Sequence, residues 1–393
     1  MTPLIDRTTP VDWWFAFKFN AATYQSVASA EPVHAIFGGR PKGYASGFSL
    51  QYAVASSQAP SLVFGGAGRD IGTSLDDPLG ATFAQVYTGT CNYVVWNDQF
   101  YGSPLNNLEA PWGHSKGLLA WDDSGNGFVL QVSTPSWPAS GSALSPRIND
   151  GNTLGCVSDD NVEVSQHFFA LRLSSAGVAQ ILAGLQRAAV ATRPDVPQLV
   201  HLTPACPNQL KTLVNGLGKE SGDGVGTVYL SDLSPDGGPR IGLIAKPATL
   251  HVPPWQMVSS VLGGVPLRVA SWWDDPKIPS THPGQTLKCW DGSLNAPAGS
   301  VEIATSGTWM GKQIGLVGGR GGAFNHAKVG VSTDPSRKVC VFGDMNQQGT
   351  LDGNTKERVP CASSQNGRGG LFYVVEHPVL HQSLTALLTG GSA

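Results

Sequence analysis

The chain has 393 residues, which is enough for two domains or for one large fused domain. Charged residues make up 13% of it and the formal net charge is −3 at pH 7, against a usual charged share of roughly 25%. The 49 Gly and 28 Pro are typical of a chain rich in strands and loops. No apolar run approaches the ~18 residues of a membrane span, so the composition excludes a membrane-spanning helix.

The start of the chain and its histidines bear on where the protein works. Residues 1–7 are polar and do not form the charged and then apolar pattern of a signal peptide. A protein that is not exported by that route and a chain that begins after a removed signal both stay open. Protonation of all nine His would change the net charge from −3 to +6, which favours a polyanionic partner in mildly acidic surroundings.

Strands and helices alternate in the first half. Residues 11–19 are bulky and aromatic and predict a strand covered on both faces, because the adjacent Trp13 and Trp14 point to opposite sides. A short helix is predicted at 77–87, and a longer one from Ser174 or Ser175 to about residue 191. The further predicted strands are 93–99, 118–121, 127–135 and 167–173.

A His-x-Lys pair, His114 and Lys116, stands directly before the predicted strand at 118–121. Residues i and i+2 of a strand point to the same face, so one imidazole and one ammonium would lie side by side. An imidazole can attack phosphorus or transfer a proton, and an ammonium can hold a phosphate oxygen. A His-x-Lys motif that occurs once is more often a coincidental exposed His and Lys.

The second half repeats the alternation. Residues 192–197 are the candidate linker, which divides the chain into halves at 1–192 and 193–393. The predicted helices are 207–218 and 253–263, and the predicted strands are 240–246, 267–273, 301–305, 313–317, 338–342 and 371–375. This pattern predicts an α/β or α+β fold.

The second half also contains a second His-x-Lys pair, His326 and Lys328. In both copies an Asp follows the Lys after five residues, at Asp122 and Asp334, in predicted hairpin turns. His is scarce, at nine residues, so two matched copies are unlikely by chance. We interpret the two halves as an internal duplication, or pseudo-dimer, with one His-x-Lys hairpin each.

The six cysteines contain no Cys-x-x-Cys pair, which disfavours a structural zinc site. An even number allows up to three disulfides with fifteen possible pairings. Cys340 and Cys361 lie close together in the second half, and we expect that pair first. Buried free thiols are the alternative.

Two His-x-Lys pairs brought together would suffice for phosphodiester cleavage without a metal or other cofactor. One His would attack phosphorus and form a phosphohistidine, and the other would protonate the leaving alkoxide and then activate water. The two Lys would offset charge on the non-bridging oxygens. The acid His must start protonated, which predicts a mildly acidic optimum if its pKa is near the ordinary ~6.5.

Several segments, taken in this order, resemble the deoxyribonuclease II family, acid endonucleases related to the phospholipase D superfamily. The resemblance runs nearly end to end. Its segments are 10–15 with Lys18, 79–80, 97–99, 112–117, 127–128 with 133–135, 154–158, 326–328, 343–346 and 364–370.

The resemblance implies a metal-independent endonuclease that leaves 3′-phosphate and 5′-hydroxyl ends. It implies two phospholipase D-like halves in a pseudo-twofold, mixed-sheet clamp with helices outside, holding double-stranded DNA in a central groove. It carries His114, Lys116, His326 and Lys328 over as catalytic residues, with His114 as nucleophile and His326 as general acid. The substrate-binding residues it suggests are Asn346, Gln365 and Arg368; for Arg368 a Gly-flanked turn residue is an equal alternative.

The sequence departs from the animal pattern in three ways. Val132 and Ser136 each stand where the animal proteins usually have a His, so an imidazole that supports the catalytic residues is missing. The usual N-terminal partner of Cys156 is not evident, and no signal peptide is present. These departures indicate a bacterial or otherwise distant member. A secreted, periplasmic or lysosome-like acidic compartment is expected, with the cytoplasm open, and monomer and homodimer are both open.

Two other functions compete with DNA hydrolysis. A phospholipase D-type enzyme on a lipid or another phosphodiester would use the same chemistry, but a lipid substrate predicts an exposed apolar rim, and no clear stretch supplies one. A non-catalytic module that binds DNA or glycan through a Trp-rich surface would tolerate loss of both His114 and His326.

Overall fold

A computed structural model describes residues 1–26, 47–66, 70–100, 104–135, 137, 140–146, 161–220, 229–234, 238–294, 296–353 and 359–393. Within these residues the fold is mixed α+β and mostly sheet, which confirms the predicted class. No described helix is long and apolar enough to cross a membrane. The predictions that concern Ser136 and Cys156 lie outside the described residues.

The first sheet has eight strands in the order β3-β2-β1-β7-β6-β5-β4-β8, all antiparallel to their neighbours. Its last strand, β8, lies beyond residue 192, so the sheet continues past the predicted boundary. The strands are β1 (Trp13–Lys18), β2 (Tyr52–Ser56), β3 (Val63–Phe64), β4 (Asn92–Asn97), β5 (Lys116–Trp121), β6 (Gly127–Val132), β7 (Gln166–Leu173) and β8 (Val200–His201).

The second sheet has seven strands in the order β12-β11-β15-β16-β17-β10-β9, and it is mixed because β11 and β12 are parallel. A separate two-stranded hairpin is formed by β13 (Ser306–Trp309) and β14 (Lys312–Gly315). The seven strands are β9 (Tyr229–Asp232), β10 (Arg240–Lys246), β11 (Leu267–Ala270), β12 (Val301–Ile303), β15 (Val329–Ser332), β16 (Val339–Gly343) and β17 (Gly370–Glu376).

The central strands of the two sheets follow one pattern. In the first sheet they run β1-β7-β6-β5-β4, and in the second β10-β17-β16-β15-β11. In each sheet the first of these strands in the chain pairs with the last, and the others follow in reverse chain order. This repetition of topology supports the internal duplication. The pseudo-twofold axis and the division into two domains stay predictions.

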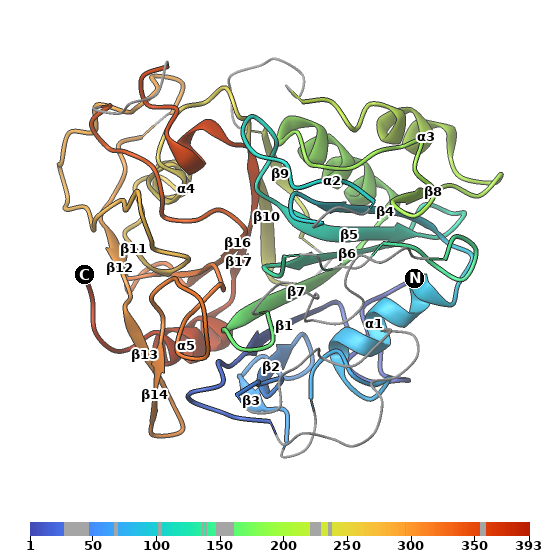
Figure 1. The fold of residues 1–393 in the computed structure, drawn as a ribbon, viewed down its shortest axis with the longest axis horizontal. Helices are drawn as coiled ribbons and strands as arrows, with labels where there is room; N and C mark the ends of the chain where they lie inside the picture. The colour runs from blue at the N-terminus through green and yellow to red at the C-terminus, as the bar shows by residue number, and fades with distance from the viewer. Residues whose placement is uncertain are drawn as a thin grey trace.

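Helices pack against the sheets. Figure 1 shows the first sheet on the right and the second on the left. Helix α2 contacts both sheets, through β6 and β10. It begins where predicted, capped by the Ser174 side chain, but ends four residues earlier than expected. The helices are α1 (Pro78–Tyr87), α2 (Ser175–Arg187), α3 (Asn208–Asn215), α4 (Pro254–Val261), α5 (Pro378–Leu387) and the 3-10 helix η1 (Ser364–Gly367).

Aromatic side chains join the two sheets in one core. The Phe15 ring of β1 stacks on Phe342 of β16 with 4.4 Å between ring centroids, and Phe169 of β7 lies 5.0 Å from Phe342. Both Trp13 and Trp14 are fully buried, which confirms that β1 is covered on both faces. Because apolar burial is the main stabilising contribution to folding, the two sheets stabilise each other.

The expected pairing of Cys340 with Cys361 is wrong. The disulfide joins Cys289 to Cys361, with 5.3 Å between the Cα atoms. Cys340 is a free thiol in the middle of β16, between the partner strands β15 and β17, where it is buried in the core. Proximity in sequence misled here, because Cys340 is enclosed within the sheet whereas Cys361 lies on a loop that meets Cys289.

Candidate active site

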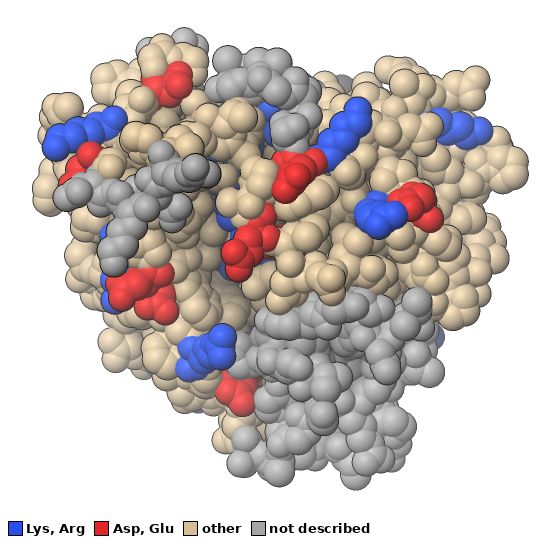
Figure 2. Space-filling view, turned by 45° about the horizontal axis from the view of Figure 1, so that its top comes forward, with Lys and Arg blue, Asp and Glu red and all other residues tan. Residues whose placement is uncertain are grey.

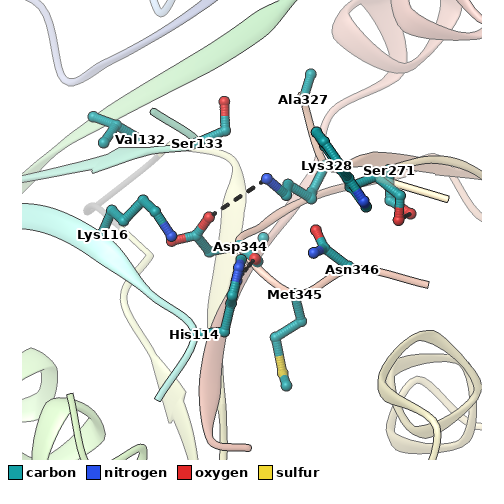
Figure 3. Close-up of polar contacts among 12 residues, drawn as sticks. His114, Lys116, Val132, Ser133, Ser271, Ala327, Lys328, Asp344, Met345 and Asn346 are labelled. Atoms are coloured by element: carbon teal, nitrogen blue, oxygen red, sulfur yellow. Dashed lines mark hydrogen bonds and ion pairs between the residues drawn. The ribbon is translucent and has the colours of Figure 1, made fainter. Parts of the chain in front are cut away.

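The two His-x-Lys pairs stand at the starts of equivalent strands. Lys116 is the first residue of β5, and Lys328 directly precedes β15, as the sequence predicted. All four side chains are at least nine-tenths buried, with 7% exposure for His114 and 6% for His326. Figure 3 shows His114, Lys116 and Lys328 converging on Asp344, which follows β16.

Each histidine is held by the backbone of the opposite half. The His114 amide N–H donates to the Gly369 carbonyl at 2.9 Å, and the His326 amide N–H donates to the Ser165 carbonyl at 2.8 Å. Gly369 directly precedes β17 and Ser165 directly precedes β7, so the two contacts are topologically equivalent. The two pairs are thereby fixed relative to each other by main-chain atoms.

Two glycines allow the first of these contacts. A Cβ placed on Gly113 would lie 2.4 Å from the carbonyl oxygen of Ala188, and one on Gly369 would lie 2.1 Å from the same oxygen. Both distances are far below van der Waals contact. Only Gly at positions 113 and 369 allows the segments that carry His114 and Arg368 to pack against the end of α2.

A buried ion pair surrounds the first Lys. The Lys116 ammonium lies 2.7 Å from one carboxylate oxygen of Asp98, whose other oxygen accepts from Arg368 at 2.9 Å. Burial alone would raise the pKa of Asp98, but the charges of Lys116, His114 and Arg368 outweigh it and lower the pKa. Asp98 is therefore ionised and holds two cations in a buried site, where breaking such a pair is costly.

The His114 ring is fixed in one tautomer. Its Nδ1 lies 2.5 Å from the backbone carbonyl of Asp344. A carbonyl can only accept, so Nδ1 carries the proton and Nε2 holds the lone pair. Burial, together with the Lys116, Arg368 and Lys328 cations, lowers the pKa of His114 well below its usual 6.5. The ring is therefore neutral, and its Nε2 lone pair carries no proton.

The Asp344 carboxyl group faces the second Lys, although the sequence analysis assigned it no role. One of its oxygens lies 4.0 Å from the Lys328 ammonium. Burial raises the pKa of this carboxyl to about 6, even though Lys116 and Lys328 oppose the shift. Asp344 therefore changes charge between mildly acidic and neutral pH.

An aromatic ring replaces the charges around the second histidine. Trp272, which follows β11 as Asp98 follows β4, packs edge-on against His326 with 4.3 Å between ring centroids. The His326 ring also hydrogen-bonds to the Gly319 backbone, and burial with the nearby Lys328 charge lowers its pKa well below 6.5. The two imidazoles thus have different surroundings.

The three suggested substrate-binding residues, Asn346, Gln365 and Arg368, have different contacts. Asn346 lies beside His114 in Figure 3; its amide nitrogen donates to Gln348 at 3.0 Å, and its backbone N–H donates to Gln365 at 3.3 Å. Arg368 donates to the backbone carbonyls of Trp112 and Leu108 at 2.9 Å, besides Asp98. The Arg368 guanidinium thus anchors the segment before His114.

The repeated Asp residues lie outside the site. An Asp122 oxygen accepts from the backbone N–H groups of Ser124 and Asn126 at 3.0 and 3.2 Å, in the turn between β5 and β6. Asp334 accepts from the backbone N–H of Ser336 at 2.8 Å, in the turn between β15 and β16. Both carboxylates close hairpin turns.

An imidazole that the sequence analysis did not single out lies near the second pair. His167 of β7 is fully buried and contacts the backbone of Lys328. Val132 stands where the resemblance leads us to expect a His, and Phe168, next to His167, is its partner in the neighbouring strand. Only tertiary structure brings His167 to the site, because β7 and β15 are distant in sequence.

The match to a known family covers the first His-x-Lys pair. Residues 4–192 match the family described as deoxyribonuclease II. These residues are slightly less than half of the chain, and over them the chain is similar to the deoxyribonuclease II family. No curated protein matches the chain. This similarity indicates a nuclease.

Within the described ranges, no group of three or more His, Cys, Asp or Glu side chains is placed to hold a metal ion. The second His-x-Lys pair lies beyond the residues that match deoxyribonuclease II. Its link to the first pair comes from the Asp344 contacts and the reciprocal backbone hydrogen bonds.

Proposed function

We propose that the protein is a metal-independent DNA endonuclease that leaves 3′-phosphate and 5′-hydroxyl ends. One observation carries the proposal: the ring of His114, from the first half, hydrogen-bonds to Asp344 of the second half, whose carboxyl group lies 4.0 Å from Lys328. Groups from both His-x-Lys pairs thus share one residue. The match of residues 4–192 to deoxyribonuclease II supports DNA as the substrate.

In the proposed reaction, Nε2 of His114 attacks the phosphorus of a DNA phosphodiester. The P–O5′ bond breaks, and His326 gives its proton to O5′ of the departing fragment. The fragment on the 5′ side of the break stays attached to His114 through its 3′-phosphoryl group as a phosphohistidine. His326 then takes a proton from water, which attacks phosphorus and releases the 3′-phosphate. Lys116 and Lys328 stabilise the charge on the non-bridging oxygens.

The pKa shifts favour acidic conditions for this reaction. The His326 imidazolium has to be present before the leaving oxygen can be protonated. Burial and the Lys328 charge lower the pKa of His326, so the imidazolium forms at a lower pH than the ordinary ~6.5 allows. A bound phosphodiester carries a negative charge, which favours the protonated ring. The reaction should therefore be faster at pH 5 than at pH 7.

Double-stranded DNA in a groove between the halves is the proposed partner. Figure 2 shows one face of the molecule. On the described residues of that face, Lys and Arg side chains lie singly among Asp and Glu, without a continuous basic stripe. A sparse set of cations makes few phosphate contacts, and each contact contributes to the salt dependence of binding. A DNA substrate predicts binding that weakens as salt is raised.

The test is cleavage of supercoiled plasmid at about pH 5 with a chelator present, an acidity chosen because imidazole titrates near ~6.5. Wild-type protein should nick and linearise the plasmid. His114→Ala and His326→Ala should each reduce the rate by at least ~100-fold, the usual contribution of an acid–base group. His282→Ala removes an exposed His and serves as the matched control.

Four outcomes would contradict the proposal. Intact plasmid with wild-type protein, or a strict need for Mg²⁺, would exclude the metal-independent reaction. Hydrolysis of phospholipid vesicles without cleavage of DNA would indicate the phospholipase D-type alternative. DNA binding that survives in both His variants, with no cleavage by the wild type, would indicate a binding module.

A further inference from the structure

His167 forms two hydrogen bonds that define its tautomer. Its Nδ1 receives the backbone N–H of Lys328 at 3.1 Å, and its Nε2 lies 2.8 Å from the side-chain carbonyl of Gln131. A backbone N–H can only donate, so Nδ1 carries no proton. The proton is on Nε2 and is donated to Gln131. The ring is fully buried, and both of its nitrogens are used by these contacts.

Gln131 extends this contact to a second strand of the other half. Its amide nitrogen donates to the backbone carbonyl of Gly343 at 3.1 Å, across the junction of the sheets, and to Val132 at 3.2 Å. Gly343 directly precedes Asp344, and its N–H donates to the Lys328 carbonyl at 3.1 Å. The two side chains of the first sheet therefore hold the backbone on both sides of the Lys328–Asp344 contact.

The surroundings of the ring keep it neutral and in place. Phe15 stacks near it with 6.2 Å between ring centroids, and Phe342 lies 6.4 Å away on the other half. Burial and the Lys328 charge lower the pKa of His167 well below 6.5. Protonation would place a hydrogen on Nδ1 and break the bond to Lys328. The ring thus stays an acceptor under mildly acidic conditions.

The equivalent position of the second half has no such group. His167 is the second residue of β7, and the second residue of its counterpart β17 is Leu371. A Leu side chain cannot accept a hydrogen bond, so this contact serves Lys328 alone. It adds to the difference that Asp98 and Trp272 make between the two His-x-Lys pairs.

We propose that His167, oriented by Gln131, is a positioning residue that sets the place of the Lys328 ammonium against the phosphate. The inference rests on the proposed function, because Lys328 matters through the charge that develops in phosphodiester cleavage. His167 itself touches no substrate atom in this scheme. It acts by fixing the main chain from which the Lys328 side chain extends, where a displacement of about 1 Å can cost ~100-fold in rate.

Three substitutions separate the two hydrogen bonds. His167→Asn keeps an acceptor at the place of Nδ1, His167→Gln keeps a donor near the place of Nε2, and His167→Phe keeps only the ring. We expect the Gln and Phe variants to lower kcat about 10- to 100-fold with little change in KM. The Asn variant should keep most of the activity, because the Lys328 N–H retains its acceptor.

A double-mutant cycle tests whether the effect passes through Lys328. In a Lys328→Ala background, His167→Phe should change the rate less than about twofold, as expected when the group it positions is absent. In a Lys116→Ala background the same substitution should retain its full effect. A bis(p-nitrophenyl) phosphate substrate, with a good leaving group, keeps these weakened enzymes measurable.

His381 supplies the matched control. It is also buried, and its Nε2 hydrogen-bonds to the Ser332 carbonyl at 2.8 Å, at the opposite end of the same strand β15. His381→Phe should lower the unfolding temperature as His167→Phe does. It should leave kcat at its wild-type value, because the end of the strand that it holds is distant from Lys328.

The inference is wrong if the Asn, Gln and Phe variants lose equal activity, or if His167→Phe has the same effect with and without Lys328. It is also wrong if His381→Phe reproduces the loss of kcat. Failure of the proposed function shows separately, as a wild type that cleaves neither substrate. In that case orthovanadate binding decides: the Phe and Gln variants should bind it at least ~10-fold more weakly than the Asn variant.

Discussion

Asp344 contributes to the site with both its backbone and its side chain. Its carbonyl fixes the tautomer of His114, and its carboxyl group lies 4.0 Å from the Lys328 ammonium. An ionised Asp344 competes with a substrate phosphate for Lys328, whereas a protonated one does not. With a pKa raised to about 6 by burial, the carboxyl group loses its charge as the pH falls into the mildly acidic range.

Asp344→Asn should therefore broaden the pH range of activity toward neutral pH. Deprotonation of Asp344 and deprotonation of His326 should each reduce activity. On the alkaline side of the profile, a plot of log(kcat/KM) against pH should therefore fall with a slope of about −2 in the wild type. The Asn variant retains only His326, and its slope should be about −1. Initial rates between pH 4 and 8 measure this, and equal slopes in both proteins would contradict the role of Asp344.

The same substitution has a signed effect on stability. The folded pKa of Asp344 is raised from 3.8 to about 6, so its stabilising contribution is complete below pH ~3.8 and is lost as pH rises through 6. Asn cannot titrate. The free energy of unfolding of Asp344→Asn relative to wild type should rise between pH 4 and 7, by up to about 3 kcal/mol. Thermal unfolding across that range provides the measurement.

Among the single residues of the site, the sequence predicts those in a repeated motif. It misses those that reach the site only through contacts between distant strands. The two His-x-Lys pairs are visible because the pattern occurs twice in a chain with nine His. His167 and the carboxyl group of Asp344 owe their place to a junction between strands more than a hundred residues apart. No local pattern marks such a residue before the sheets are assembled.

Two hairpins place the His-x-Lys pairs, one formed by β5 and β6 and one by β15 and β16. Each closes in a turn whose Asp accepts backbone N–H groups, at Asp122 and Asp334. Hairpin register is set by the turn. The Asp that follows each Lys after five residues thus contributes to register rather than to chemistry.

Asp334→Ala should lower the unfolding temperature slightly and leave kcat on DNA unchanged. The Ser336 N–H loses its acceptor, but the turn is exposed and water can replace the carboxylate. Differential scanning calorimetry and plasmid cleavage measure the two effects, with Asp334→Asn as the control that keeps an acceptor. A large loss of kcat without unfolding would place Asp334 in the chemistry after all.

The sequence predicts the elements that have strong local patterns, and it misses very short strands and the last helix. The apolar strand β1, the hairpin strands and α2 all appear where the sequence placed them. The strands β3 and β8 have two residues each, too few to show an alternation. They exist because they pair with the edges of a sheet that has already formed. Helix α5, capped by His377, was also missed.

The whole molecule is held together across its halves by a shared core and by main-chain hydrogen bonds. The Cys289–Cys361 disulfide lies within the second half and closes a segment of 72 residues. Cross-linking of that length restricts the unfolded chain and stabilises a protein by about 4 kcal/mol in the chain-entropy model. Cys361 also stands shortly before η1, which carries Gln365.

Replacement of both cysteines, as Cys289→Ala with Cys361→Ala, should reduce the free energy of unfolding by roughly 2–4 kcal/mol. Urea unfolding under non-reducing conditions measures it. The free thiol Cys91 provides the control, because Cys91→Ser leaves the disulfide intact. A wild-type protein whose stability is indifferent to reducing agent would contradict this account.

A site completed within one chain makes a further prediction. A mixture of the His114→Ala and His326→Ala proteins should remain inactive on plasmid, because the described contacts join both pairs inside a single chain. Recovery of a substantial share of wild-type activity on mixing would instead indicate that two copies exchange halves. Size-exclusion chromatography of the mixture then distinguishes exchange from simple contamination.

The unequal surroundings of the two imidazoles have a consequence for how a DNA strand would enter. Around a symmetric pair, a strand could lie in either direction, and half of those arrangements would present O5′ to the wrong ring. Here Asp98 and the Asp344 carbonyl accompany His114, whereas Trp272 and the Gly319 backbone accompany His326. In the proposed reaction, only the direction that points O5′ toward His326 is productive. The fused chain would thereby recognise strand polarity, even though it reads no base.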